Sequence, residues 1–213
     1  MIETASGLVL RTRRLTETSL IIHWLTPDLG RIATVAKGAL RPKSPFRGKI
    51  DLFYLADFSF VRSRHSELHT LREVSVQETY PAIRRELGRV QQASYAAALV
   101  EQVTEAETPL PDIFELAQGF LGALSEMSPE PHFIFAFELK LLAELGLEPN
   151  LERSRLTAGA REIVRVLKER DWRAISNLKM SAGQANELTQ FLHGFLVYHL
   201  GKIPAARFAA VDS

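Results

Sequence analysis

Six cationic side chains and no acidic one lie between Arg31 and Ile50, in the segment RIATVAKGALRPKSPFRGKI. Cations this close together repel one another unless an anion neutralises them, and nucleic acid is the commonest polyanionic partner. Glycine, proline and serine residues interrupt the segment, so we expect its middle to be a loop. The segment predicts a nucleic-acid contact, and the alternative is a solvated loop whose charges serve only solubility.

Neighbouring residues refine that prediction. Arg11, Arg13 and Arg14 end the first predicted strand and extend the cationic patch. Phe46 lies inside the loop, and its ring either stacks a base or plugs the fold. Trp24 is expected in the core, as is Tyr54. No constellation of residues suggests that base edges are read, so we expect little sequence preference.

Other chemistry has little support in the sequence. The chain contains neither GxxxxGK[ST] nor GxGxxG, and no serine lies in a GxSxG turn. His65 and His69 have HxxxH spacing, but no flanking ligand pattern accompanies them, and a polar hairpin is the simpler interpretation. We therefore predict that the protein is not an enzyme, and name no catalytic residue.

Composition indicates a folded protein with two kinds of surface. The 213 residues have a net charge of +1, are 46% hydrophobic and include no cysteine, which excludes disulfides and thiolate metal sites. Residues 1–80 hold 12 Lys and Arg against 8 Asp and Glu, whereas the remainder is mildly acidic. No signal sequence or membrane-spanning stretch is visible, so we expect a cytoplasmic protein without a membrane partner.

The first third of the chain has the pattern of strands separated by turns. Apolar and β-branched residues alternate with polar ones, and a Pro27–Gly30 turn predicts a hairpin. The expected strands are residues 6–15, 18–26, 30–37, 52–60 and 67–77. Five strands in this length fit a Greek-key barrel of the oligonucleotide-binding (OB) type, and another small β-barrel is the alternative.

After Pro81 the pattern changes to helical spacing. Helices are expected over residues 82–106, from Pro111 to Met127, over 132–145, over 160–170 and from a capping box at Ser181 to Leu200. The apolar segment 132–145 is expected at the centre, and Gly146 is expected to end it. The predicted fold is α+β, with an OB-fold DNA-binding domain at 1–80 and an all-α domain at 81–213.

Three segments resemble the RecO family of bacterial recombination mediators. They are LTETSLIIHWLTPDLGRIATVAKGALRPKSPFRGKIDLF near the start, FELKLLAELGLEPNL in the middle and HLGKIPAARF near the end. Many family members carry a four-cysteine zinc motif after the position of Asn150. Here the segment reads LERSRLTAGAREIV, without a cysteine, so we expect neither a metal nor another cofactor.

The resemblance implies a non-enzymatic protein that binds single- and double-stranded DNA and anneals complementary strands. It also implies RecR and the C-terminal tail of single-strand-binding protein as partners, and assistance in loading RecA. The implied phosphate contacts are Lys37, Arg41, Lys43, Arg47 and Lys49, with Arg11 and Arg14 beside them. The alternative function is a protein-interaction adaptor in which the OB-fold module only docks.

Overall fold

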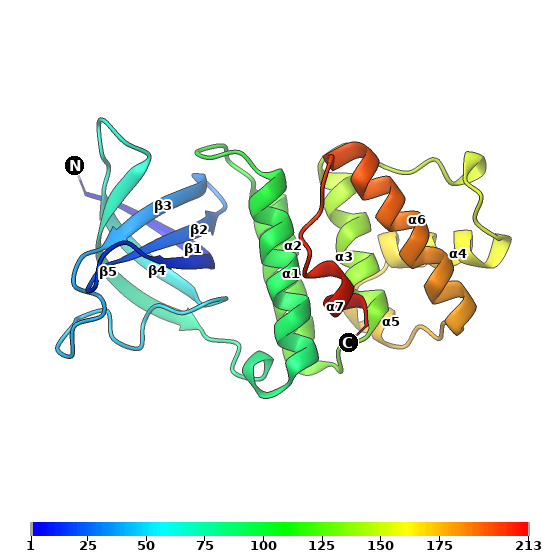
Figure 1. The fold of residues 1–213 in the computed structure, drawn as a ribbon, viewed down its shortest axis with the longest axis horizontal. Coiled ribbons are helices and arrows are strands. Elements are labelled where there is room, and N and C mark those ends of the chain that lie inside the picture. Colours follow the sequence, from blue (N-terminus) through cyan, green and yellow to red (C-terminus); the bar gives the residue numbers. More distant parts are fainter. Residues whose placement is uncertain (1, 213) are drawn as a thin grey trace. The chain divides into compact units, whose positions relative to one another are not determined.

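The computed structural model describes residues 2–212, so the first and last residues of the two expected domains lie outside it. The fold is α+β, as expected, with five strands followed by helices (Figure 1). The described chain forms two compact units. Within the described residues, one comprises 2–80 and Val100–Gln118, and the other comprises Pro81–Leu99 and 119–212.

The five strands close into a barrel in the order β1-β2-β3-β5-β4, with β4 returning to β1. All pairs are antiparallel except β3 with β5. This order and strand number are those of an OB-fold. The strands are β1 (Ile2–Arg14), β2 (Leu20–Thr26), β3 (Gly30–Ala36), β4 (Leu55–Val61) and β5 (Leu68–Glu78).

Large apolar side chains fill the barrel because the strands alternate inward and outward residues. Trp24 and Phe58 stack at a ring-centroid distance of 4.1 Å. The indole nitrogen of Trp24 donates to the hydroxyl of Thr34 at 2.8 Å, which satisfies its one polar group in the core. Tyr54, in contrast, is only half-buried at the edge of this core.

Three strand starts differ from the prediction by more than one residue. Strand β1 begins at Ile2 rather than residue 6, β2 at Leu20 rather than residue 18, and β4 at Leu55 rather than residue 52. Residues 52–54 are not part of β4, although their alternation favoured a strand from residue 52. Phe53 has a φ of 67° and is buried, and its N–H donates to the Val9 carbonyl. A left-handed residue cannot continue a strand, so this anchored turn delays the start of β4 to Leu55.

The second part of the chain is helical. Its α-helices are α1 (Leu87–Val103), α2 (Pro111–Glu126), α3 (Pro131–Glu144), α4 (Ala158–Glu169), α5 (Trp172–Ser176), α6 (Ala182–Leu200) and α7 (Arg207–Val211). Two 3-10 turns, Ile83–Arg85 and Leu151–Arg153, precede α1 and α4. The short α5 and α7 were not predicted. No helix among residues 2–212 combines the length and apolar character that crossing a bilayer requires.

Helix α3 is the centre of the helical unit, as its apolar sequence predicted, with ten buried residues. Gly146 follows it with a φ of 70°, the left-handed conformation that ends many helices. The predicted capping box at the start of α6 is present, because the Ser181 and Gln184 side chains each bond to the other residue's backbone N–H.

Candidate nucleic-acid interface

The five cations of the predicted loop lie between β3 and β4, in residues 37–54, which we call the basic loop (Figure 1). It contains no helix or strand. Loops of this length without regular structure are usually either functional or disordered. This one is held in place by contacts at both of its ends and in its middle.

Backbone hydrogen bonds fix the two ends. At the first end, the Leu40 N–H donates to the Thr18 carbonyl at 3.0 Å. At the second end, the Phe53 N–H donates to the Val9 carbonyl, and the Val9 N–H donates to the Tyr54 carbonyl, each at 2.9 Å. Residues 18 and 9 belong to the β1–β2 connection and to β1, so the loop is attached to the barrel wall.

Between these ends the loop is a succession of tight turns. N–H groups of Ala39, Arg41, Ser44, Arg47 and Lys49 donate to carbonyls three residues earlier, at 3.0–3.3 Å. Gly38 and Gly48 supply left-handed backbone, with φ values of 70° and 73°. The loop is therefore ordered before it meets a ligand, which lowers the entropic cost of binding.

Phe46 holds the middle of the loop. Its ring is 8% exposed and belongs to the same apolar cluster as Trp24 and Phe58. Of the two roles considered from the sequence, the structure therefore supports the plug. Burying this one ring leaves the polar residues on either side of it at the surface, where the cations on the loop face solvent.

All seven predicted contacts are exposed. Within residues 2–212, Arg11 forms an ion pair with a carboxylate, at 3.4 Å from Glu101, and the other six form none. The Arg47 guanidinium instead donates to the Pro42 carbonyl at 3.3 Å, which orients the side chain and leaves its charge uncompensated. Six of the seven cations are thus free to meet an anion.

The pairing of the strands places Arg14 nearer to the loop than Arg11. Arg14 lies opposite Leu20, and Leu20 lies opposite Ala36, the last residue before the loop. Two strand spacings, about 10 Å, separate Arg14 from that point. Arg11 is three residues further along β1, opposite His23. Arg14 therefore belongs with the loop cations, whereas Arg11 belongs with the neighbouring wall of the barrel.

That wall is covered by residues 101–110, which pack with the barrel in the same compact unit. The Glu101 carboxylate lies 3.4 Å from Arg11 and 3.2 Å from His23 Nδ1. A guanidinium N–H of Arg31 donates to the Thr104 carbonyl at 3.1 Å. Desolvation lowers the pKa of His23, and Arg11 and Arg31 lower it further against the opposing effect of Glu101. Sequence reasoning missed this segment, because no local pattern links Glu101 to β1 and β2.

A second acidic residue of the same segment contacts β5, the strand that pairs with β3. Glu107 accepts from the buried His69 at 3.1 Å and pairs with Arg62 at 3.1 Å. Arg62 also donates two bonds to Glu3, which lowers the pKa of that carboxyl. His65 lies in the turn before β5, so the HxxxH histidines do not share a strand face. These contacts make His69 part of the barrel's packing, whereas His65 is exposed.

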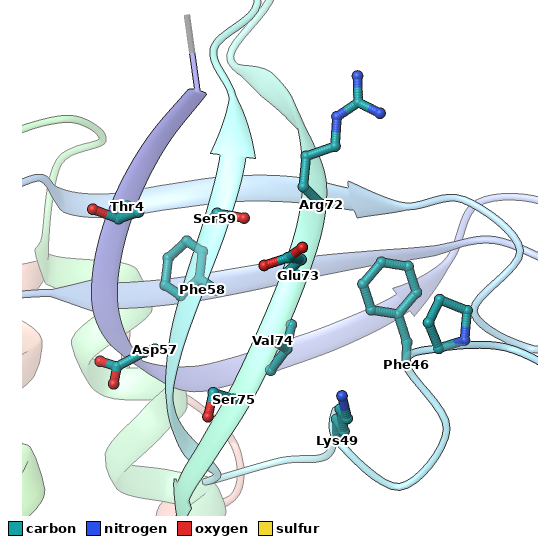
Figure 2. A pocket seen from close by; sticks show the side chains of 11 residues that line it. Thr4, Phe46, Lys49, Asp57, Phe58, Ser59, Arg72, Glu73, Val74 and Ser75 are labelled. Carbon is teal, nitrogen blue, oxygen red and sulfur yellow. The ribbon is translucent and has the colours of Figure 1, made fainter.

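Two hollows open on either side of Phe46. One has a volume of about 480 Å³ and lies between the loop and the outer part of β4 and β5. Figure 2 shows Phe46 and Lys49 on the loop across from Glu73 and Val74. We call it the mixed-charge hollow, since Asp57 and Glu73 accompany Lys49 and Arg72 in its lining.

The other, which we call the arginine hollow, has a volume of about 470 Å³ and lies within the loop itself. Arg41 and Arg47 are its charged residues, and no acidic residue lines it. Neither hollow was predicted, because the sequence does not show where the loop folds back on the ring of Phe46.

The segment after Asn150 does not fit a zinc ion. It contains no cysteine, and no three His, Cys, Asp or Glu side chains come together anywhere in residues 2–212. Asn150 caps the Leu151–Arg153 turn by accepting from the Arg153 N–H, and Glu152 pairs with Arg165 at 3.0 Å. Hydrogen bonds and ion pairs therefore close this region.

Comparison with known proteins gives one consistent result. A family model described as "Recombination protein O N terminal" matches residues 1–80, and one described as "Recombination protein O C terminal" matches residues 84–157. A "DNA repair protein RecO" of Anaeromyxobacter dehalogenans (strain 2CP-C) is 28% identical over 95% of this chain and 93% of its own length.

Two further relatives carry the same name. That of Anaeromyxobacter sp. (strain K) is 33% identical over 69% of this chain, and that of Exiguobacterium sibiricum is 34% identical over 71%. The aligned part of this chain spans 58% and 60% of those two proteins. The two family models together match more than half of the chain and the relatives carry the same family name, so this chain belongs to the RecO family.

Proposed function

We propose that this protein is a DNA-binding mediator of recombinational repair that binds single and double strands and anneals complementary ones. One observation carries the proposal: five cations with no carboxylate partner in the described residues 2–212 project from an ordered loop on an OB-fold barrel, in a chain whose relatives are named DNA repair proteins. OB-folds hold strands by cationic surfaces that follow the phosphate backbone.

Annealing needs no bond to be made or broken, so the proposal assigns no catalytic residue. Two strands repel each other through their phosphates, and a protein that neutralises both lowers the cost of bringing them together. Lys37, Arg41, Lys43, Arg47 and Lys49 are the proposed contacts on the loop. Arg14 extends them along β1, and Arg11 contributes less because Glu101 already pairs with it.

Family membership supports the remaining parts of the proposal. We propose that the protein acts in the cytoplasm with RecR and the C-terminal tail of single-strand-binding protein, and that it assists RecA loading. We also propose that residues 1–80 are the DNA-binding domain and 81–213 the helical domain. Residues 100–118 pack with the barrel, so tests of DNA binding require the full chain.

A fluorescence strand-annealing assay tests the proposal. Two complementary strands labelled with a donor and an acceptor dye are mixed with the full chain at low and at high salt. The protein should accelerate annealing at low salt, and salt should suppress the acceleration. Replacing Lys37, Arg41 and Lys43 together with alanine should abolish most of it.

The matched control replaces Arg153, Arg173 and Lys179 with alanine, which changes the net charge equally. These three residues are exposed in the helical unit and form no ion pair among residues 2–212. Annealing that is equally fast with both triple variants contradicts the proposal.

A protein-interaction adaptor is a second candidate, and a groove in the helical unit favours it. The groove has a volume of about 720 Å³ and is lined by Phe191, Phe195 and Tyr198 of α6, with Arg155 and Glu187 at its rim. Tyr198 is 83% exposed, which is unusual for a large ring. An adaptor would keep its partners but show no annealing in the assay above.

A further inference from the structure

The arginine hollow combines an apolar floor with a purely cationic rim. Leu20, Leu40, Phe46 and Ile50 supply the apolar part, and Arg41 and Arg47 supply the charge. Leu40 is 39% exposed, so this apolar side chain faces solvent, unlike the buried Phe46 and Phe53 of the same loop. Its volume of about 470 Å³ lies in the range of small-molecule sites, roughly 300–1,000 Å³.

The two hollows beside Phe46 differ in how strongly their charged residues attract a phosphate. The mixed-charge hollow sets Asp57 and Glu73 against Lys49 and Arg72, so it offers no net attraction to a phosphate. The arginine hollow has two guanidiniums and no carboxylate. Arginine presents a flat fork of donors that suits phosphate oxygens and also stacks on planar rings. Its charge is thus complementary to a nucleotide.

Two local contacts orient the arginines of the rim. The Arg47 guanidinium donates to the Pro42 carbonyl at 3.3 Å. The stem of Arg41 passes over Gly38, where an added Cβ would lie 3.4 Å from its Cδ. Both arginines are therefore arranged beside the apolar floor before a ligand arrives.

We propose that the arginine hollow accepts one unpaired nucleobase of a single strand, with Leu40, Ile50 and the edge of Phe46 against the base. Arg41 and Arg47 hold the phosphates on either side. The inference rests on the proposed DNA-binding function and makes it more specific. A base stacked and paired in a duplex cannot enter the hollow, so it distinguishes single strands from double strands.

The test compares Leu40→Ser with the wild-type full chain. Leu40→Ser removes apolar surface at an exposed position and leaves every charge in place. A single-stranded oligonucleotide should bind about five-fold more weakly, in keeping with the contribution of one base contact. The dependence of affinity on salt should not change, and binding of a duplex of the same length should not change either.

Leu87→Ser is the matched control, since it makes the same chemical change at a position that is 72% exposed in α1. It should bind both DNA forms as the wild type does. A 2-aminopurine placed within the single strand reports on the surroundings of that base. Its fluorescence should change when the strand binds the wild type, and it should change much less when the strand binds Leu40→Ser.

Three results distinguish a failure of the proposed base site from a failure of the DNA-binding function. Equal single-strand affinity of Leu40→Ser and the wild type, with the Lys37, Arg41 and Lys43 triple variant still impaired, overturns the base site and leaves the DNA-binding function intact. If the triple variant is also unimpaired, the proposed function itself fails. If an acidic peptide with apolar residues binds through Leu40 while the oligonucleotide does not, the hollow is a protein-binding site and the inference is wrong.

Discussion

The basic loop of the barrel and helix α7 of the helical unit use the same side chain in opposite ways. On the loop, Arg41 is exposed and has no carboxylate partner among residues 2–212. In α7, Arg207 is 1% exposed and donates to both oxygens of Glu138 at 2.6 and 2.9 Å. The buried pair serves folding, and the free cations are available to a ligand.

The contrast shows that the location of the counter-charge decides the role of a cation. Tyr95 adds a third member to the buried group by donating to Glu138 at 2.6 Å, and burial together with that carboxylate raises the pKa of Tyr95. Glu138 hydrogen bonds also raise the pKa of Arg207 against the opposing effect of desolvation. Among residues 2–212 none of the five loop cations has a carboxylate partner, so a ligand can supply their counter-charge.

The largest effect is expected at the buried pair. Arg207→Ala leaves the Glu138 carboxylate buried without its cation, which should lower the free energy of unfolding by about 3–5 kcal/mol. Urea unfolding followed by circular dichroism measures the change. Arg173→Ala, at an exposed position in α5, should alter it by less than about 0.5 kcal/mol. Equal stability of the two variants would show that the pair contributes nothing to folding.

Substitutions in the basic loop should weaken DNA binding without lowering stability, in contrast to Arg207→Ala. Replacing Lys37, Arg41 and Lys43 with alanine should weaken DNA binding by about 10²-fold at 50 mM salt, because three phosphate contacts are lost. Stability should hardly change, since exposed side chains without partners contribute little. Fluorescence anisotropy with several unrelated sequences measures the affinity. Loss confined to one sequence would indicate base readout and contradict phosphate binding.

Acidification should destabilise the fold through His23, which is half-buried, and His132, which is buried. Burial lowers the pKa of His23 and of His132, so both are neutral in the folded chain at a pH where the unfolded chain is protonated. The free energy of unfolding should therefore fall as the pH drops below about 6.5, by at most about 1.4 kcal/mol per pH unit for each histidine.

Urea unfolding between pH 7.5 and 5.5 measures this slope. His132→Leu should flatten it, whereas His65→Asn, at an exposed position, should leave it unchanged. An unchanged slope in His132→Leu would mean that other groups control the acid response.

The smallest effect concerns Arg11, which lies between the two classes of cation. Glu101→Gln removes its partner and adds one free cation on the wall of the barrel next to the loop cations. DNA affinity at low salt should rise by less than about five-fold, because a partly exposed ion pair is worth at most about 1 kcal/mol. Fluorescence anisotropy measures the gain. A lower affinity would show that Glu101 supports the DNA-binding surface.

Sequence patterns predicted the fold well wherever the signal was local. Alternation located the five strands, and Ser181 with Gln184 marked the start of α6. The start of β4 was missed because the left-handed turn at Phe53 depends on its contacts with Val9. Helix α7 was missed because its five residues are stabilised by the distant Glu138.

The candidate site was predictable only where its signal is local in the sequence. A run of lysines and arginines is visible in the sequence, and so is the loop that carries it. The pairing of Arg11 with Glu101 is not visible, because 90 residues separate the two. The hollows beside Phe46 also depend on how the loop folds back onto the barrel, which only the coordinates show.

The salt dependence of single-strand binding tests the central claim most directly. If the five loop cations each neutralise one phosphate, the plot of log affinity against log salt should have a slope of about −3.5 for the wild type. The Lys37, Arg41 and Lys43 triple variant should have a slope of about −1.4, and the helical control triple variant should match the wild type. Equal slopes for the wild type and the loop variant would contradict the claim that these side chains bind the phosphate backbone.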